Sequence, residues 1–124
     1  MNILLDSDVI IEVLRAKDRA LLVRWSVLME SEDEVYFSPI SAAEIWPHVR
    51  PSEHAAISRF FRPLSCAKID YKVGHLAGEL YRQYCKTHKV EIADALLAAT
   101  AIQNQSALWT LNRTHFPMAE LTLY

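Results

Sequence analysis

The chain has 124 residues and contains little glycine, cysteine or proline, with 2 Gly, 2 Cys and 5 Pro. So few glycines and prolines argue against a disordered or low-complexity segment. The two cysteines, Cys66 and Cys85, do not form a C-x-x-C pair, so a structural zinc site or a thioredoxin-like redox pair is not indicated. We expect both to be buried thiols in a reducing compartment, and the protein to be cytoplasmic.

Long apolar runs are also missing. No stretch approaches the roughly 18 apolar residues that span a membrane. The first apolar run, Ile3 to Leu5, is interrupted by Asp6, so we expect neither a secretory signal nor a membrane partner. The net charge of -2 argues against a protein that coats nucleic acid by bulk electrostatics, although a local basic patch is still compatible with it.

Apolar residues make up 52% of the chain, enough for one core without disulfides, and the length predicts a single domain over 1–124. Short apolar runs predict strands, and apolar residues at helical spacing predict the helices between them. The expected strands are 2–5, 35–37, 64–69, 107–110 and 120–123. The expected helices are 9–14, 18–30, 41–46, 52–61, 71–87 and 93–103. This alternation predicts an α/β fold, a three-layer α/β/α sandwich around a parallel sheet of four to five strands.

Acidic side chains stand where such a fold binds ligands, beyond the carboxyl ends of its strands. Asp6 and Asp8 follow the first expected strand, Glu44 lies beyond the second, and Asp94 opens the most apolar helix, I-A-D-A-L-L-A-A-T-A. Carboxylates that meet in one crevice raise one another's pKa unless a cation shares the site. Because a purely oxygen donor set suits Mg²⁺ or Mn²⁺, we predict a metal site formed by Asp6, Glu44 and Asp94.

Each acid also has a structural alternative. A helix that begins at Val9 needs an N-cap, which three residues can supply: Asp6, Ser7 and Asp8. Ser41 and Glu44 have the S-x-x-E spacing of a capping box, with Ser41 as the N-cap. Asp94 lies in the first turn of its helix, where the macrodipole favours an anion. Taken singly, each acid leaves both interpretations open, and only their joint position favours the metal site.

Four segments, in this order along the chain, resemble the PIN-domain nucleases, especially the toxin halves of VapC-type toxin–antitoxin pairs. They are I-L-L-D-S-D-V-I-I (3–11), I-S-A-A-E-I-W (40–46), I-A-D-A-L-L-A-A-T-A (92–101) and L-W-T-L-N-R-T-H-F (108–116). The resemblance implies an α/β/α sandwich with acids clustered at the carboxyl edge of its sheet. It also implies divalent-metal-dependent cleavage of RNA phosphodiester bonds.

The resemblance places Asp6, Glu44 and Asp94 on the three acidic positions of the family, as catalytic residues and metal ligands. The fourth position, where an acid is usual, falls on Asn112. An amide still accepts a hydrogen bond or holds a metal-bound water, but it adds no charge, which leaves open whether one or two ions bind. His115 stands where many relatives have an acid, and we expect it to be a surface residue.

Other residues are expected to support this site. Arg113, next to Asn112, and Arg15 are candidate contacts to RNA phosphates. Asp8 is either a partner that helps hold Asp6 or only a helix cap. Hydrogen bonds to the carboxylates or to metal-bound waters are expected from a further set of hydroxyl groups: Ser7, Ser41 and Thr110.

The favoured interpretation is a Mg²⁺/Mn²⁺-dependent endoribonuclease, the toxin component of a type II toxin–antitoxin system. The resemblance further implies a cognate antitoxin whose tail fills the active groove, and a homodimer. Two alternatives stay open. The D-x-D of Asp6 and Asp8 also begins haloacid-dehalogenase-like phosphatases, although Ile10 stands where threonine or valine is usual there. A non-catalytic PIN-fold binding module is favoured only by Asn112.

Overall fold

The computed structural model describes all 124 residues, and its centre is a five-stranded sheet in the order β3-β2-β1-β4-β5. Every neighbouring pair of strands is parallel. The strands are β1 (Asn2–Leu5), β2 (Glu34–Phe37), β3 (Ser65–Cys66), β4 (Ser106–Trp109) and β5 (Thr122–Leu123). The helices are α1 (Ser7–Arg15), α2 (Arg19–Glu30), α3 (Pro39–Ile45), α4 (His54–Phe61), α5 (Tyr71–His88) and α6 (Ile92–Gln103). Three 3-10 turns complete the chain: η1 (Trp46–His48), η2 (Pro51–Glu53) and η3 (Arg113–His115).

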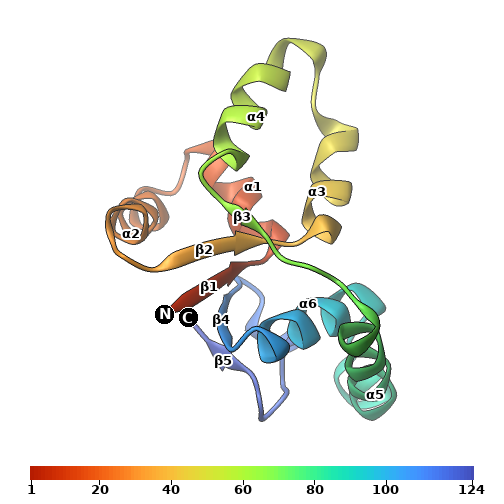
Figure 1. Ribbon diagram of the computed structural model, residues 1–124. Helices are drawn as coiled ribbons and strands as arrows, with labels where there is room; N and C mark the ends of the chain where they lie inside the picture. Colours follow the sequence, from red (N-terminus) through yellow and green to blue (C-terminus); the bar gives the residue numbers. More distant parts are fainter.

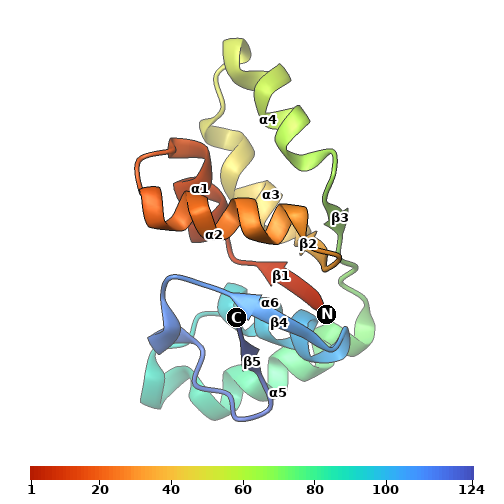
Figure 2. The ribbon, with the colours of Figure 1, turned by 90° about the vertical axis from the view of Figure 1, so that its left-hand side faces the viewer.

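The predicted three-layer sandwich is confirmed. Helices α1 to α4 lie on one side of the sheet, and α5 and α6 lie on the other (Figures 1 and 2). Successive side chains of a strand point to opposite faces, so Ile3 and Leu5 of β1 join the core under α1 and α2, whereas Leu4 joins the core under α5 and α6. All three are at most 1% exposed, which is why this central strand is a continuous apolar run.

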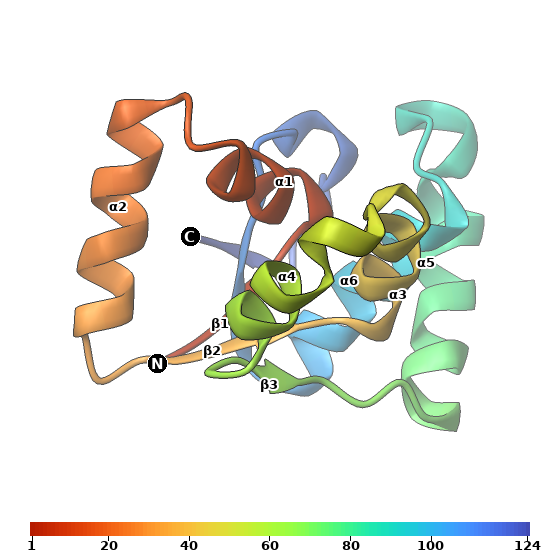
Figure 3. The same cartoon turned by 90° about the horizontal axis from the view of Figure 1, so that it is seen from above.

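Helix α6 packs closely against both the sheet and α5 because its buried face is mostly alanine: Ala95, Ala98, Ala99 and Ala101. Its first turn reaches the same edge of the sheet at which β1, β2 and β4 end. Seen from above, α1, α3 and the start of α6 converge around that edge (Figure 3). The fold therefore brings the beginnings of these helices to the carboxyl ends of the strands.

The helix expected at 41–46 begins two residues earlier, and this changes the role of Ser41. Ser38 is the N-cap, its side chain accepts a hydrogen bond from the amide of Ile40 (3.1 Å), and Pro39 occupies the first helical turn. Proline is favoured there because its φ is already helical and it has no N–H to satisfy. The capping box of Ser41 and Glu44 is therefore wrong, and Ser41 is a buried residue inside α3.

Two other expectations are wrong, namely the length of the third strand and the burial of the two cysteines. The strand expected at 64–69 is only Ser65–Cys66, because the chain leaves the sheet after Ala67 bonds to Phe37 and turns toward α5. Cys66 on this edge strand is exposed and Cys85 on α5 is half-buried, so neither is a fully buried thiol.

No helix in the structure combines the length and the apolar character required to cross a lipid bilayer.

Candidate active site

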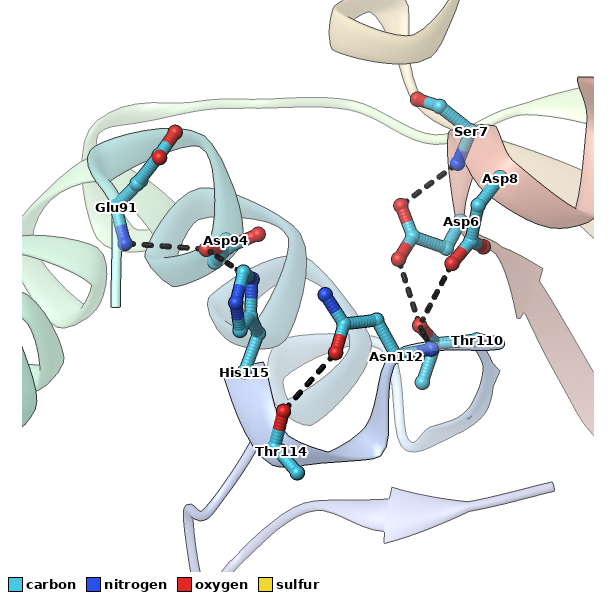
Figure 4. A network of polar contacts seen from close by, with 9 residues as sticks. All are labelled: Asp6, Ser7, Asp8, Glu91, Asp94, Thr110, Asn112, Thr114 and His115. Atoms are coloured by element: carbon cyan, nitrogen blue, oxygen red, sulfur yellow. Dashed lines mark hydrogen bonds and ion pairs between the residues drawn. The ribbon is translucent and has the colours of Figure 1, made fainter. Parts of the chain in front are cut away.

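Asp6 joins the ends of two neighbouring strands. It follows β1 and is the N-cap of α1, where its Oδ1 accepts a hydrogen bond from the amide of Ser7 (2.7 Å). Its Oδ2 accepts a hydrogen bond from the hydroxyl of Thr110 (2.7 Å), the residue that follows β4. Asp6 is therefore both a helix cap and a candidate site residue, because one of its oxygens caps α1 while the other faces the end of β4 (Figure 4).

The surroundings of Asp6 destabilise the ionised form of its carboxyl group. Burial first, and then the charge of Asp8, raise the pKa of Asp6 to about 6, with a smaller contribution from Asp94. The hydrogen bonds from Thr110 and from the Ser7 amide oppose this rise in pKa but do not cancel it. Ionisation of Asp6 is therefore unfavourable in the protein alone, and a bound cation would stabilise the ionised form.

This raised pKa predicts a pH dependence of stability. Folded Asp6 binds its proton more tightly than unfolded Asp6, so its contribution to the free energy of unfolding falls as the pH rises from 3.8 to about 6. A shift of roughly two pKa units corresponds to about 3 kcal/mol at most. Denaturant unfolding in EDTA should show wild type losing stability relative to Asp6→Asn between pH 3.8 and about pH 6. Two parallel stability curves would contradict the raised pKa.

Asp8 ties α1 to the segment that follows β4. Its Oδ2 accepts a hydrogen bond from the amide of Leu111 (3.1 Å) and lies 3.5 Å from the Thr110 hydroxyl. Its Oδ1 is buried and has no hydrogen-bond partner. Burial is also the main cause that raises the pKa of Asp8, and the Leu111 amide opposes it. Since Asp6 is the cap of α1, Asp8 is a second acid in the site rather than the helix cap.

Glu44 is held at the rim of the site by serine hydroxyls. The Ser7 Oγ lies 2.9 Å from Glu44 Oε1 and also 2.9 Å from Ser41 Oγ. Because a hydroxyl has one proton and a carboxylate is the stronger acceptor, Ser7 donates to Glu44 and accepts from Ser41. The buried Ser41 therefore supports Glu44 through Ser7, while Glu44 itself is exposed.

Asp94 also has two functions in the structure. It is the third residue of α6, as expected for an acid in the first turn, and its Oδ2 accepts a hydrogen bond from the amide of Glu91 (3.0 Å). The same oxygen lies 3.5 Å from Nδ1 of His115. The side chain of His115 is 37% exposed, so this residue is half-buried rather than fully on the surface as expected, and its contact with Asp94 was not predicted. The only sequence signal for it was its place at a position where relatives have an acid.

The remaining candidates lie around η3 and α1. The side-chain Oδ1 of Asn112 accepts a hydrogen bond from the Thr114 hydroxyl (3.0 Å). The guanidinium of Arg113 donates to the backbone carbonyl of Tyr124 (3.1 Å), so this side chain is occupied away from the acids. Arg15 forms an exposed ion pair with Glu12 (3.2 Å).

An open groove adjoins the acidic residues between α1, α3 and α4. Its volume is about 540 Å³, and four residues contribute polar groups to its lining: Arg15, Glu44, His48 and Glu53. The rest of the lining is mainly apolar and includes Ile11, Leu14, Ile45, Val49 and Ile57. Such a groove is suited to an apolar side chain that is accompanied by a charge.

The acids fit a hydrated metal ion better than a complete protein cage. No three His, Cys, Asp or Glu side chains lie close enough together to form a ready-made metal cluster, since Glu44 is turned to Ser7 and Asp94 to Glu91. However, every candidate donor is an oxygen, burial disfavours the charge of Asp6, and Asp8 Oδ1 is buried without a partner. These features suit a hard cation such as Mg²⁺ that keeps several of its own waters.

The sequence matches the PIN domain family over residues 3–120. The chain belongs to the PIN-domain family. It is similar to Ribonuclease VapC19 of Mycobacterium tuberculosis, with 31% identity over 116 residues, which are 93% of this chain and 92% of that protein. It is also similar to Toxin FitB of Neisseria gonorrhoeae, with 32% identity over 135 residues, covering 98% of this chain and 96% of FitB.

A solved structure supports the same PIN fold. The crystal structure of VapBC2 from Rickettsia felis bound to a promoter DNA fragment superposes with a TM-score of 0.82, at 20% identity, over 100% of this chain and 98% of that one. The family predicted from the four sequence segments is therefore confirmed. Since the D-x-D of Asp6 and Asp8 belongs to a PIN domain, the haloacid-dehalogenase alternative is wrong.

Proposed function

We propose that the protein is a Mg²⁺- or Mn²⁺-dependent endoribonuclease of the VapC type, the cytoplasmic toxin of a type II toxin–antitoxin system, with 1–124 as its single nuclease domain. The observation that carries this proposal is the half-buried Asp6, whose pKa is raised to about 6 beside Asp8 and Asp94 at the carboxyl edge of a PIN-domain sheet. The similarity to a named ribonuclease and to a named toxin supports it.

In this proposal, Asp6 and Asp94 hold the divalent ion, with Glu44 at the rim of the site. The ion, when bound, polarises the scissile phosphate and makes water a better nucleophile. The rest of the chain orients the carboxylates. Thr110 fixes Asp6, and the amide of Glu91 fixes Asp94.

Glu44 is suited to accept a proton from the attacking water. Its Oε1 is engaged by the Ser7 hydroxyl, so Oε2 is the oxygen available as a base. Arg15 is exposed in the adjoining groove and is paired only with Glu12, so it is the better candidate for an RNA phosphate contact. Arg113 would first have to leave the carbonyl of Tyr124.

The reaction class is tested with a synthetic RNA and its fully 2′-O-methylated copy. Because water rather than the 2′-hydroxyl is the nucleophile, both should be cut internally when Mg²⁺ or Mn²⁺ is added. Binding of the RNA without any cut under these conditions would instead support the non-catalytic PIN module. Cleavage of only the unmethylated RNA would contradict the water mechanism.

The groove beside Glu44 is the surface on which we place the antitoxin tail. Its apolar lining would take aliphatic or aromatic side chains, and Glu44 would attract a cationic side chain of the same segment. A tail bound there would cover Glu44, which accounts for inhibition of the nuclease. The homodimer implied by the family resemblance is retained in this proposal, and the molar mass in light scattering tests it.

Ile11→Asp is expected to weaken antitoxin binding at least tenfold. Ile11 lines the groove and is 40% exposed, so an aspartate there is tolerated by the fold but removes an apolar contact and places a charge in the groove. Val27→Asp is the matched control, because Val27 is exposed on α2 and does not line the groove. Calorimetric titration with the antitoxin encoded beside this protein measures the difference. Equal affinities for both variants would exclude the groove.

A further inference from the structure

The segment that follows β4 holds Asn112 at two points. Its backbone amide donates a hydrogen bond to the Thr110 hydroxyl (3.0 Å), and its side-chain Oδ1 accepts one from the Thr114 hydroxyl (3.0 Å). Thr110 in turn donates to Asp6, so the position of Asn112 is coupled to the centre of the site. The amide side chain therefore has a defined orientation relative to the acids.

This orientation turns the amide nitrogen toward the side of the site on which His115 and Asp94 lie. In Figure 4, Nδ2 of Asn112 points to the side of the site on which Asp94 and His115 lie, while Oδ1 points to Thr114. Nδ2 has no hydrogen-bond partner within the protein. The reverse orientation would turn an acceptor oxygen to the side of the site that already holds the Asp94 carboxylate, which is electrostatically less favourable. Asn112 thus presents a donor, not an oxygen ligand, to the site.

We propose that Asn112 is a substrate-binding residue that donates a hydrogen bond from Nδ2 to a non-bridging oxygen of the RNA phosphodiester. This inference rests on the proposed ribonuclease function. A phosphodiester accepts hydrogen bonds but donates none, and it must lie beside several carboxylates, so a neutral donor among them stabilises it. The neighbouring Arg113 does not fill this role, because its guanidinium is bonded to Tyr124. In this proposal Asn112 contacts the RNA and does not replace an acid as a metal ligand.

Asn112→Asp distinguishes a hydrogen-bond donor to RNA from an oxygen ligand to the metal ion, because it replaces the NH₂ group by an oxygen without a change of shape. If Asn112 is a donor, kcat/KM on a synthetic RNA should fall at least tenfold, the effect expected for a lost hydrogen bond to a charged group. Mn²⁺ binding, measured by calorimetry with the metal alone, should be as tight as in wild type or tighter. Asn112→Ala should fall between wild type and Asn112→Asp in cleavage. Asn104→Asp, at the end of α6, controls for the added charge.

The inference is overturned if Asn112→Asp cleaves RNA as well as wild type or better, because the position then accepts an acid. It is also overturned if Asn112→Ala is as active as wild type. Anisotropy of a labelled RNA with Mn²⁺, in the Glu44→Gln background, should show a loss of binding of at least tenfold when Asn112→Asp is added. If wild type cleaves no RNA but this loss of binding is found, the proposed function fails and the donor role stands.

Discussion

Asp6→Asn is expected to lose RNA cleavage by at least about 100-fold and to melt at a higher temperature than wild type in metal-free buffer. The loss follows because a metal ion contributes several kcal/mol to the stabilisation of the transition state, and this substitution removes a ligand charge. The gain in stability follows from the raised pKa of Asp6, since at neutral pH the folded protein holds an unfavourable anion that asparagine abolishes. Asparagine caps a helix about as well as aspartate, so α1 keeps its N-cap.

The matched control for this prediction is Asp70→Asn. Asp70 is the N-cap of α5, where its side chain accepts a hydrogen bond from the amide of Val73 (3.0 Å), far from the candidate site. The same chemical change there should leave both cleavage and the melting temperature close to wild type. Cleavage assays and thermal melts in EDTA measure both properties. A destabilised Asp6→Asn, or one that remains active, would contradict the role assigned to Asp6.

Glu44→Gln is expected to reduce cleavage by at least about 100-fold with almost no change in stability. The amide oxygen of glutamine still accepts the hydrogen bond of Ser7, so the side chain keeps its position but loses its charge and its basicity. Because Glu44 is exposed, the free energy of unfolding should change by no more than about 0.5 kcal/mol. Single-turnover cleavage and denaturant unfolding measure the two effects.

Glu79→Gln is the control for the loss of an exposed carboxylate, because Glu79 lies on α5 and pairs only with His75. It should cleave RNA at the wild-type rate. Full activity in Glu44→Gln would exclude Glu44 as the base. An unfolded Glu44→Gln would instead mean that the carboxylate is required by α3, which its exposure argues against.

The sheet and the positions of the acids could be predicted because local patterns encode them. The buried run of β1 ends at Asp6, and the alanine-rich face of α6 begins just after Asp94, so each acid is placed by the end or the start of a regular element. In parallel sheets these ends lie at one edge. The placement of Asp6 and Asp94 at that edge was therefore readable without the structure, although no three acidic side chains form a ready-made metal cluster there.

The start of α3 was predicted wrongly because two serines compete for the same role. Ser38 and Ser41 both have the side chain of an N-cap, and the S-x-x-E spacing favoured Ser41. Pro39 decides the matter, because proline belongs in the first turn of a helix and so requires a cap directly before it. The sequence alone therefore contains the signal that places the N-cap at Ser38.

Contacts that depend on η3 could not be predicted. A turn of three residues has no periodicity, so nothing in the sequence shows that Arg113 reaches Tyr124 or that His115 reaches Asp94. The orientation of the Asn112 amide has the same origin, because it depends on the Thr114 hydroxyl. Roles that rest on tertiary placement in irregular segments require coordinates.

The most direct test is a titration of EDTA-treated protein with Mn²⁺ or Mg²⁺ in an RNA cleavage assay, with Asp6→Asn and Asp70→Asn run in parallel. We expect no cleavage before metal is added. Cleavage should then rise to saturation in wild type and in Asp70→Asn, with at least about 100-fold less in Asp6→Asn. Cleavage that persists in EDTA, or that rises equally in Asp6→Asn, would contradict a metal-dependent nuclease centred on Asp6.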